Sequence, residues 1–380
     1  MLNAPFKHLP LIGFYFFSFA ALGALFPFIP PLLSDRGLSG ADIGWVMVML
    51  PLSGMILPPL WGALADALRM RMRLIRLASL GCAAAVWLLI PARSLWSVMG
   101  AFLLLSILRV PLVPLADAVT CAALGGRTSD FGKIRVFGSV GFALAVLGMG
   151  LVEGTHSALL LVGVTSALYL LSALATLPVK VPAVVRQPGI LREALGLLRQ
   201  RPILLFLLGS AAYYAGHSTY DAYFGLHLRA LGHGDDVLGL AWFHGVCWEI
   251  TVMLLAPRLL QGRRGGPALM LCAVAAILRW LLISVATGAW ALVAVQALHG
   301  LTFGLWYLSL VRFVQDRAPE RLRATCQSMA FTALGVGTVI GFTVGSRALD
   351  HLGGAVMYRL SAGAAFIALL LYGLVARTEK

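Results

Sequence analysis

Charged and titratable side chains interrupt several long apolar stretches of this sequence, where each must find a partner or water. They are Arg109, Asp117, Arg135, His217, Asp221, Glu249, Arg279 and His299. Burial favours the neutral form of a carboxyl group, so an apolar site can let it exchange a proton near neutral pH. The set predicts proton transfer and solute binding in a shared polar cavity, with a structural pair within a helix or between helices as the alternative for any one residue.

The second half of the chain supplies the side chains best suited to move a proton. We expect Glu249 to carry it, while Arg279 stabilises the carboxylate after release or holds a substrate anion. His299 could relay the proton or hydrogen-bond the substrate. His217 and Asp221 are four residues apart and therefore share one face of a helix. These five residues form the predicted proton-coupling group.

The elements that carry these side chains are apolar and long. The chain has 380 residues, of which 60% are hydrophobic and 12% charged. It contains about twelve segments, most of them long enough to cross ~30 Å of hydrocarbon as a helix. Backbone groups in lipid must bond to one another, which favours helices. We place the segments at 9–33, 41–64, 74–91, 95–122, 134–152, 157–178, 203–228, 237–257, 267–287, 289–312, 326–346 and 355–375. The prediction is an all-α membrane protein.

The positively charged residues lie mainly in loops, a distribution that does not indicate a nucleic-acid-binding surface. The formal net charge is +14, and most of the 29 Lys and Arg fall in loops on the side of the N-terminus. Such asymmetry predicts that both termini are cytoplasmic, in a protein of the cell (inner) membrane. A basic, amphipathic segment at 179–202 divides an N-terminal six-helix bundle (1–178) from a C-terminal one (203–380), and the first apolar segment is expected to be a retained helix.

Other classes of function find little support in the residues. Five cysteines lie in or beside apolar segments without CxxC spacing, which favours small buried side chains over disulfides or metal ligands. Motifs of metalloproteases, serine hydrolases and P-loop enzymes are missing. A membrane enzyme or a non-transporting sensor is therefore the disfavoured alternative, and we expect neither cofactor nor metal.

A resemblance to a known family makes the fold prediction more specific. The run from Gly62 to Asp66, with Arg69 beyond it, resembles the loop signature between helices 2 and 3 of the major facilitator superfamily, G-x-L-[AS]-D followed by basic residues. It departs from that pattern at Ala67 and at Arg69. The resemblance implies twelve transmembrane helices in two six-helix bundles related by a pseudo-two-fold axis. It also implies a conformational-gating role for Gly62, Asp66 and Arg69.

The residues after Asp130, DFGKIRVFGSVGF, resemble the start of helix 5 in the lactose-permease group of proton symporters. Carried over by spacing, this resemblance implies that Asp117 and Arg135 form a substrate-binding pair and that Phe142 occupies a sugar-stacking position. Arg279 and His299 then fall on the coupling arginine and histidine of that group.

Departures from the lactose-permease group point to one of its branches. Thr302 replaces a coupling carboxylate, Phe142 replaces a tryptophan, and Gly335 replaces a lysine, while Glu249 lies one turn beyond the expected acid at Val246. These features are similar to the 3-phenylpropionate permease branch. The shared runs are Pro111 to Ala118, Asp130 to Arg135, Arg279-Trp280 and Leu298 to Phe303. Arg109 belongs to neither pattern.

The resulting hypothesis is a secondary active transporter that couples solute uptake to the proton gradient by alternating access. The first candidate substrate is an aromatic carboxylate of the phenylpropionate type. Arg135 and Arg109 would bind its carboxylate, and Phe142 and Tyr15 its ring. Alternatives are a sugar or nucleoside proton symporter and a drug-efflux antiporter. Both halves lie in one chain, so a monomer in the lipid bilayer is expected, with protons and a small molecule as its partners.

Overall fold

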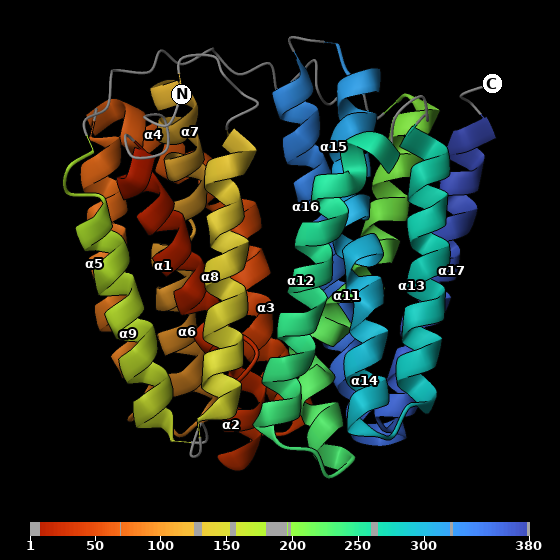
Figure 1. Cartoon of the computed structure of the whole chain (residues 1–380), viewed down its shortest axis with the longest axis horizontal. Coiled ribbons are helices and arrows are strands. Elements are labelled where there is room, and N and C mark those ends of the chain that lie inside the picture. Colours follow the sequence, from red (N-terminus) through yellow and green to blue (C-terminus); the bar gives the residue numbers. More distant parts are fainter. Residues whose placement is uncertain are drawn as a thin grey trace. The chain divides into compact units, whose positions relative to one another are not determined.

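The computed structural model describes residues 8–68, 70–124, 131–152, 157–179, 196, 199–259, 265–319 and 322–377. Every regular element in these ranges is a helix (Figure 1). The all-α prediction is therefore confirmed.

Membrane spans account for most of the described chain. Ten stretches are helical for at least 18 residues and apolar enough to cross a bilayer. α3 (Gly40–Ile56) is a shorter apolar helix of 17 residues that continues into α4 (Pro58–Leu68). α11 (Arg201–Ala230) has 30 residues but carries polar side chains along its length. Each of the twelve predicted segments coincides with one of these helices or helix pairs.

A first compact unit takes in Met1–Leu38 and Trp45–Gln187. In it, α1 packs against α8 and α9, and α5 packs against α9 (Figure 1). Most of α3, all of α4 and the other described helices of this range also belong to the unit. The bounds are α1 (Leu9–Leu25), α2 (Ile29–Asp35), α5 (Arg71–Ala85), η2 (Val86–Leu89), α6 (Leu95–Arg109), α7 (Leu112–Leu124), α8 (Phe131–Leu151) and α9 (Ala158–Ala175).

Two breaks in this unit lie at prolines. α1 ends before Pro27, and α2 begins with prolines in its first turn, where a missing N–H is tolerated. α6 and α7 are separated at Val110 and Pro111. The second break lies between Arg109 and Asp117, so spacing along one continuous helix does not predict the relative direction of these two side chains.

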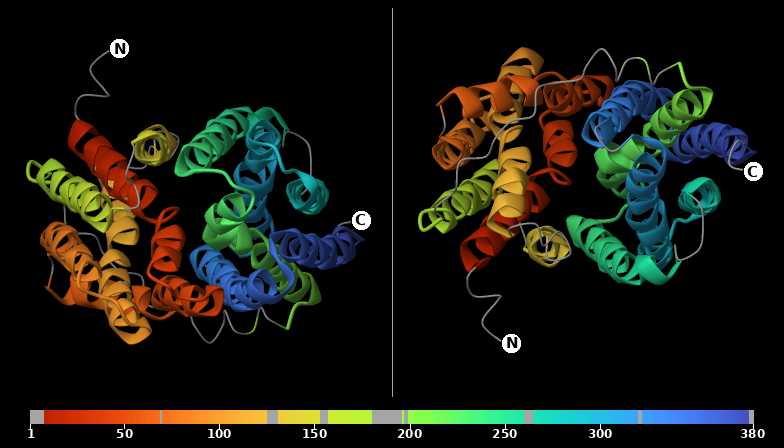
Figure 2. Two further views of the ribbon diagram at one scale, coloured as in Figure 1. Left: turned by 90° about the horizontal axis from the view of Figure 1, so that it is seen from below. Right: turned by 90° about the horizontal axis from the view of Figure 1, so that it is seen from above.

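A second compact unit takes in Ser39–Gly44 and Pro188–Lys380. Here α11 packs against α16 and α17, and α13 packs against α17 (Figure 2). The bounds are α12 (Asp235–Leu259), α13 (Gly265–Val285), α14 (Ala289–Val295), η4 (Gln296–Leu298), η5 (Gly300–Leu305), α15 (Trp306–Arg317), α16 (Arg323–Leu352) and α17 (Gly354–Arg377). The predicted division at 179–202 stays a prediction, since most of that segment lies outside the described residues.

The segment η5 is a π-helix. Such widened turns often occur at functional sites. Glycines let it approach α12 closely: a Cβ atom at Gly300 would lie 2.5 Å from the Trp248 carbonyl oxygen, and one at Gly304 would lie 3.1 Å from that of Glu249. This packing places the residue before η5, His299, beside the Glu249 side chain.

Candidate functional site

In the first unit, polar side chains from three helices meet. The buried Tyr15 hydroxyl on α1 donates a hydrogen bond of 2.6 Å to Asp117 Oδ1 on α7. The same hydroxyl lies 3.2 Å from Thr120 Oγ1, one turn after Asp117. Arg135 on α8 is close enough for its charge to act on Asp117. The structure thus brings together three of the predicted substrate-binding residues, Tyr15, Asp117 and Arg135.

The Arg135 guanidinium rests on aromatic faces. Its central carbon lies 4.0 Å from the ring centre of Phe19 and 5.6 Å from that of Tyr15. Gly138 leaves the room that this position needs, because a Cβ atom there would lie 2.8 Å from Arg135 Nη1 and 3.1 Å from the Phe19 ring. Phe142 lies farther along α8 and is buried, and its backbone packs against Gly23 of α1. Its stacking role stays a prediction.

Arg109 does not join this cluster. Its side chain is close enough for its charge to act on Tyr169 of α9 and on Cys82 of α5. The break at Val110 and Pro111 separates Arg109 from the helix that carries Asp117. These surroundings suit a structural role within the bundle, and the contact between Arg109 and a substrate carboxylate stays a prediction.

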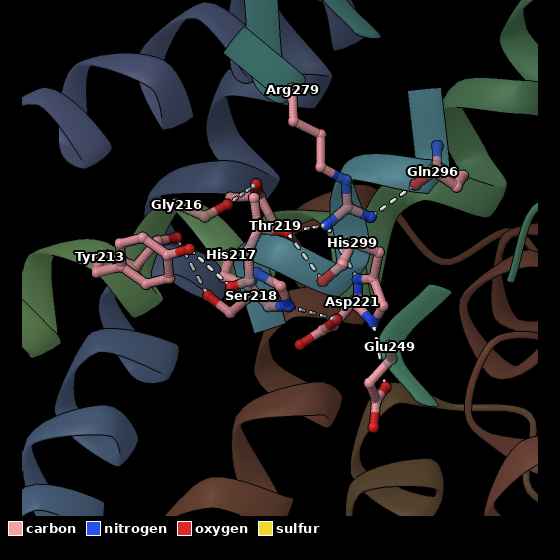
Figure 3. A network of polar contacts seen from close by, with 12 residues as sticks. Tyr213, Gly216, His217, Ser218, Thr219, Asp221, Glu249, Arg279, Gln296 and His299 are labelled. Carbon is pink, nitrogen blue, oxygen red and sulfur yellow. Dashed lines mark hydrogen bonds and ion pairs between the residues drawn. The ribbon is translucent and has the colours of Figure 1, made fainter. Parts of the chain in front are cut away.

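The second unit is built around Arg279, whose side chain is completely buried on α13. Figure 3 shows its guanidinium pointing between Gln296 and His299. Nη2 donates to Gln296 Oε1 at 2.6 Å, and Nη1 contacts His299 Nδ1 at 3.0 Å and Thr302 Oγ1 at 2.9 Å. The rings of Tyr220 and Trp280 lie 4.3 and 4.7 Å from the guanidinium carbon. Neutral acceptors and π-faces therefore hold this buried cation.

Two carboxylates flank this centre. His299 Nε2 lies 3.5 Å from Glu249 Oε2, and the Glu249 side chain is 9% exposed. On α11, His217 Nε2 lies 3.8 Å from Asp221 Oδ1, as the four-residue spacing predicts (Figure 3). The five predicted proton-coupling residues thus lie in one unit. Aromatic rings surround this group. Those rings belong to Tyr213, Tyr214, Tyr220, Trp242, Trp280, Phe303, Trp306 and Tyr358.

The balance of charge in this group is uneven. Arg279 is permanently cationic, while Asp221 and Glu249 are acids. With both acids ionised and both histidines neutral, the group carries one net negative charge in an apolar, mostly buried setting. Uptake of a single proton removes that charge, so the arrangement is suited to bind and release one proton.

Sequence reasoning missed Gln296 and Thr120. Both are neutral polar residues within apolar segments, and both are completely buried. Their spacing could have indicated them, because each lies about one helical turn from a predicted site residue. Gln296 precedes His299 by three positions, and Thr120 follows Asp117 by three.

Of the predicted gating residues, Gly62 lies in α4, and a Cβ atom there would meet nothing within 4 Å. Asp66 also belongs to α4. The Asp66 side chain and the whole of Arg69 lie outside the described residues. Their gating role stays a prediction. Within the described chain, no group of three His, Cys, Asp or Glu residues could hold a metal ion.

Comparison with known proteins places the chain among transporters. A sequence model described as the MFS_1 like family matches residues 8–360. A maltose permease of Geobacillus stearothermophilus is 32% identical over 362 residues, which cover 93% of this chain and 89% of that protein. A probable 3-phenylpropionic acid transporter of Escherichia coli (strain K12) is 26% identical, over 83% and 85% of the two chains.

Solved structures agree on the fold. The crystal structure of the nucleoside transporter NupG has a TM-score of 0.85 and 18% sequence identity, and the match covers 97% of this chain and 98% of that one. The POT family transporter PepTSo has a TM-score of 0.80 at 13% identity, over 99% and 98% of the two chains.

Proposed function

Because this chain belongs to the MFS_1 like family, and is thus a secondary transporter of the major facilitator type and not an enzyme, we propose that it is a proton-coupled symporter. In this proposal it takes up a small neutral solute rich in hydroxyl groups, of the sugar class, by alternating access. The observation that carries the proposal is the uneven charge of the proton-coupling group in the second unit, where Asp221 and Glu249 accompany one arginine, Arg279.

Proton coupling follows from that imbalance. The Glu249 carboxylate lies 3.5 Å from His299 Nε2 and is nearly buried, and burial favours the neutral, protonated form of a carboxyl group. Protonation from the outside would neutralise the group, and release to the inside would restore the charge. The proton gradient then drives the cycle, and no cofactor is needed.

The first unit supports a neutral solute. Asp117 and Arg135 balance one another in charge, so a neutral molecule can bind there without leaving an uncompensated ion. The Asp117 carboxylate and the Arg135 guanidinium supply acceptors and donors for hydroxyl groups, and Phe19 and Tyr15 supply aromatic faces. The maltose permease relative, at 32% identity, is consistent with this substrate class.

An aromatic carboxylate is the second candidate. Among the described residues, Arg135 forms no ion pair within 4.0 Å, and its guanidinium could receive a substrate carboxylate. The relative named a probable 3-phenylpropionic acid transporter is consistent with it. Uptake of radiolabelled maltose, phenylpropionate and a nucleoside into proteoliposomes, with an imposed pH gradient, separates the candidates. Accumulation of phenylpropionate alone would overturn the sugar assignment.

The proton carrier is tested with Glu249→Gln. This variant keeps the size and one acceptor oxygen of the side chain but cannot ionise. We expect it to lose acid-driven accumulation while solute exchange at equal pH continues. Thr251→Val, at an exposed position of the same helix, is the matched control and should accumulate solute normally. If Glu249→Gln still concentrates the solute against its gradient, Glu249 is not the carrier.

A further inference from the structure

Gln296 is a completely buried amide that no sequence motif singled out. Its Nε2 donates a hydrogen bond of 2.8 Å to the carbonyl oxygen of Leu292, one helical turn earlier. Its Oε1 accepts a hydrogen bond of 2.6 Å from Arg279 Nη2. A carbonyl oxygen only accepts and a guanidinium only donates, so the two contacts fix the orientation of the Gln296 amide. The side chain is a rigid support for Arg279.

Arg279 in turn determines where the hydrogen of His299 lies. Nη1 of Arg279 is 3.0 Å from His299 Nδ1, and a guanidinium has no lone pair to offer. Nδ1 must therefore be the acceptor. A neutral imidazole then carries its hydrogen on Nε2, the nitrogen that lies 3.5 Å from Glu249 Oε2. A second proton on Nδ1 would point at the donors of Arg279 and place two cations side by side.

We propose that Gln296 is a positioning residue for proton coupling: by holding Arg279, it keeps His299 in the tautomer that presents Nε2–H to Glu249. The coupling proton is then carried by the Glu249 carboxyl group and not as an imidazolium. This inference rests on the proposed proton symport and assigns His299 the role of a fixed donor to the Glu249 carboxylate.

The surrounding groups do not substitute for Gln296. Among the described residues, Asp221 is not within ion-pair distance of Arg279 and pairs with His217 at 3.8 Å. Thr302 shares Nη1 with His299 and leaves Nη2 to Gln296. The titratable and charged groups facing Arg279 and His299 are Tyr213, His217, Tyr220 and Asp221 on α11, Glu249 on α12 and Tyr358 on α17.

The direct test reads the tautomer of His299. Full-length protein labelled with ¹⁵N-histidine is reconstituted in lipid, and the His299 signals are assigned by their loss in His299→Gln. We expect the Nε2–H tautomer in the unchanged protein. Gln296→Met has a similar volume but no hydrogen bonds, and it should bring in the Nδ1–H tautomer. Gln296→Glu keeps an acceptor for Arg279 and should retain Nε2–H, whereas Gln315→Met, exposed on α15, should change nothing.

Transport gives the second readout. Gln296→Met loses one hydrogen bond to a charged group. We therefore expect its acid-driven accumulation of solute to fall about tenfold or more, and the pH profile of its transport to change. Exchange at equal pH should stay close to that of Gln315→Met.

An unchanged tautomer together with an unchanged pH profile in Gln296→Met would overturn the inference. If Gln296→Met does not fold, an Nδ1–H tautomer in Gln296→Glu or in the unchanged protein overturns it. If the unchanged protein moves no protons, symport fails, while the tautomer measurement still decides the role of Gln296 in holding His299.

Discussion

At the scale of single residues, the two units hold their arginines in different ways. Arg135 lies on the face of Phe19 and near an acid, whereas Arg279 is completely buried among neutral acceptors. A partly open guanidinium beside an acid can exchange partners when a solute arrives. A buried one with a fixed set of acceptors keeps its place. We therefore assign solute recognition to Arg135 and the organisation of the proton site to Arg279.

The hydroxyl of Tyr15 provides a test of the recognition site. Tyr15→Phe removes the 2.6 Å hydrogen bond to Asp117 and frees that carboxylate to move. A hydrogen bond to a charged group contributes about 1.5–3 kcal/mol, so we expect the KM for the transported solute to rise roughly tenfold or more. Tyr169→Phe, at a buried tyrosine near Arg109 in the same unit, is the matched control. An equal rise in KM for both variants would contradict the assignment.

At the scale of helices, close approaches position the functional side chains. η5 packs so tightly on α12 that a Cβ atom at Gly300 would lie 2.5 Å from the Trp248 carbonyl oxygen. On α8, the missing side chain of Gly138 leaves room for the Arg135 guanidinium. Glycines at these two positions therefore determine where a neighbouring functional side chain can lie.

Gly138→Ala tests this for Arg135. The added methyl group would lie 2.8 Å from Arg135 Nη1 and 3.1 Å from the Phe19 ring, so the guanidinium must leave that ring. A cation–π contact contributes about 0.5–2 kcal/mol, and we expect solute affinity to fall by roughly twofold to thirtyfold. Gly148→Ala, on the same helix with nothing within 4 Å, should bind normally. Equal affinities of the two variants in a binding assay would argue against this role for Gly138.

Much of the helix framework could be predicted from hydropathy. The segment predicted at 95–122 is Leu95–Leu124 in the structure, and the one predicted at 289–312 is Ala289–Arg317. The direction of individual side chains could not be predicted, because rotation about a helix axis is determined by packing against other helices. Arg109 therefore lies near Tyr169 of α9, a neighbour that its position in the sequence does not indicate. Gln296 was missed because an uncharged amide carries no signal until its partner is known.

At the scale of the whole molecule, we assign solute binding to the first compact unit and proton binding to the second. The first holds a charge-balanced recognition cluster around Asp117 and Arg135. The second holds a group with one excess negative charge around Arg279. If each cycle fills the first with one neutral solute and the second with one proton, the charge moved across the membrane is fixed.

Charge movement separates the two candidate substrates. A neutral sugar carried with one proton moves one positive charge inward, so an inside-negative potential should drive uptake even at equal pH. An aromatic carboxylate carried with one proton moves no net charge, and its uptake should not respond to potential. The measurement is uptake into proteoliposomes under a potassium diffusion potential set with valinomycin. Sugar uptake that ignores the potential would contradict a one-proton cycle.

The burial of Arg279 also bears on how the protein is made. Its hydrogen-bond partners follow it by 17, 20 and 23 residues, so they leave the ribosome later. α13 must therefore begin to enter the bilayer before these three hydrogen-bond partners are made, and a charge at the centre of a helix costs about 2.5–3.5 kcal/mol there. The most apolar 18-residue stretch of α13 has a mean hydropathy of 2.3, the highest among the ten candidate spans in the described chain. The apolar residues of α13 offset that cost during synthesis, before Gln296 reaches the membrane.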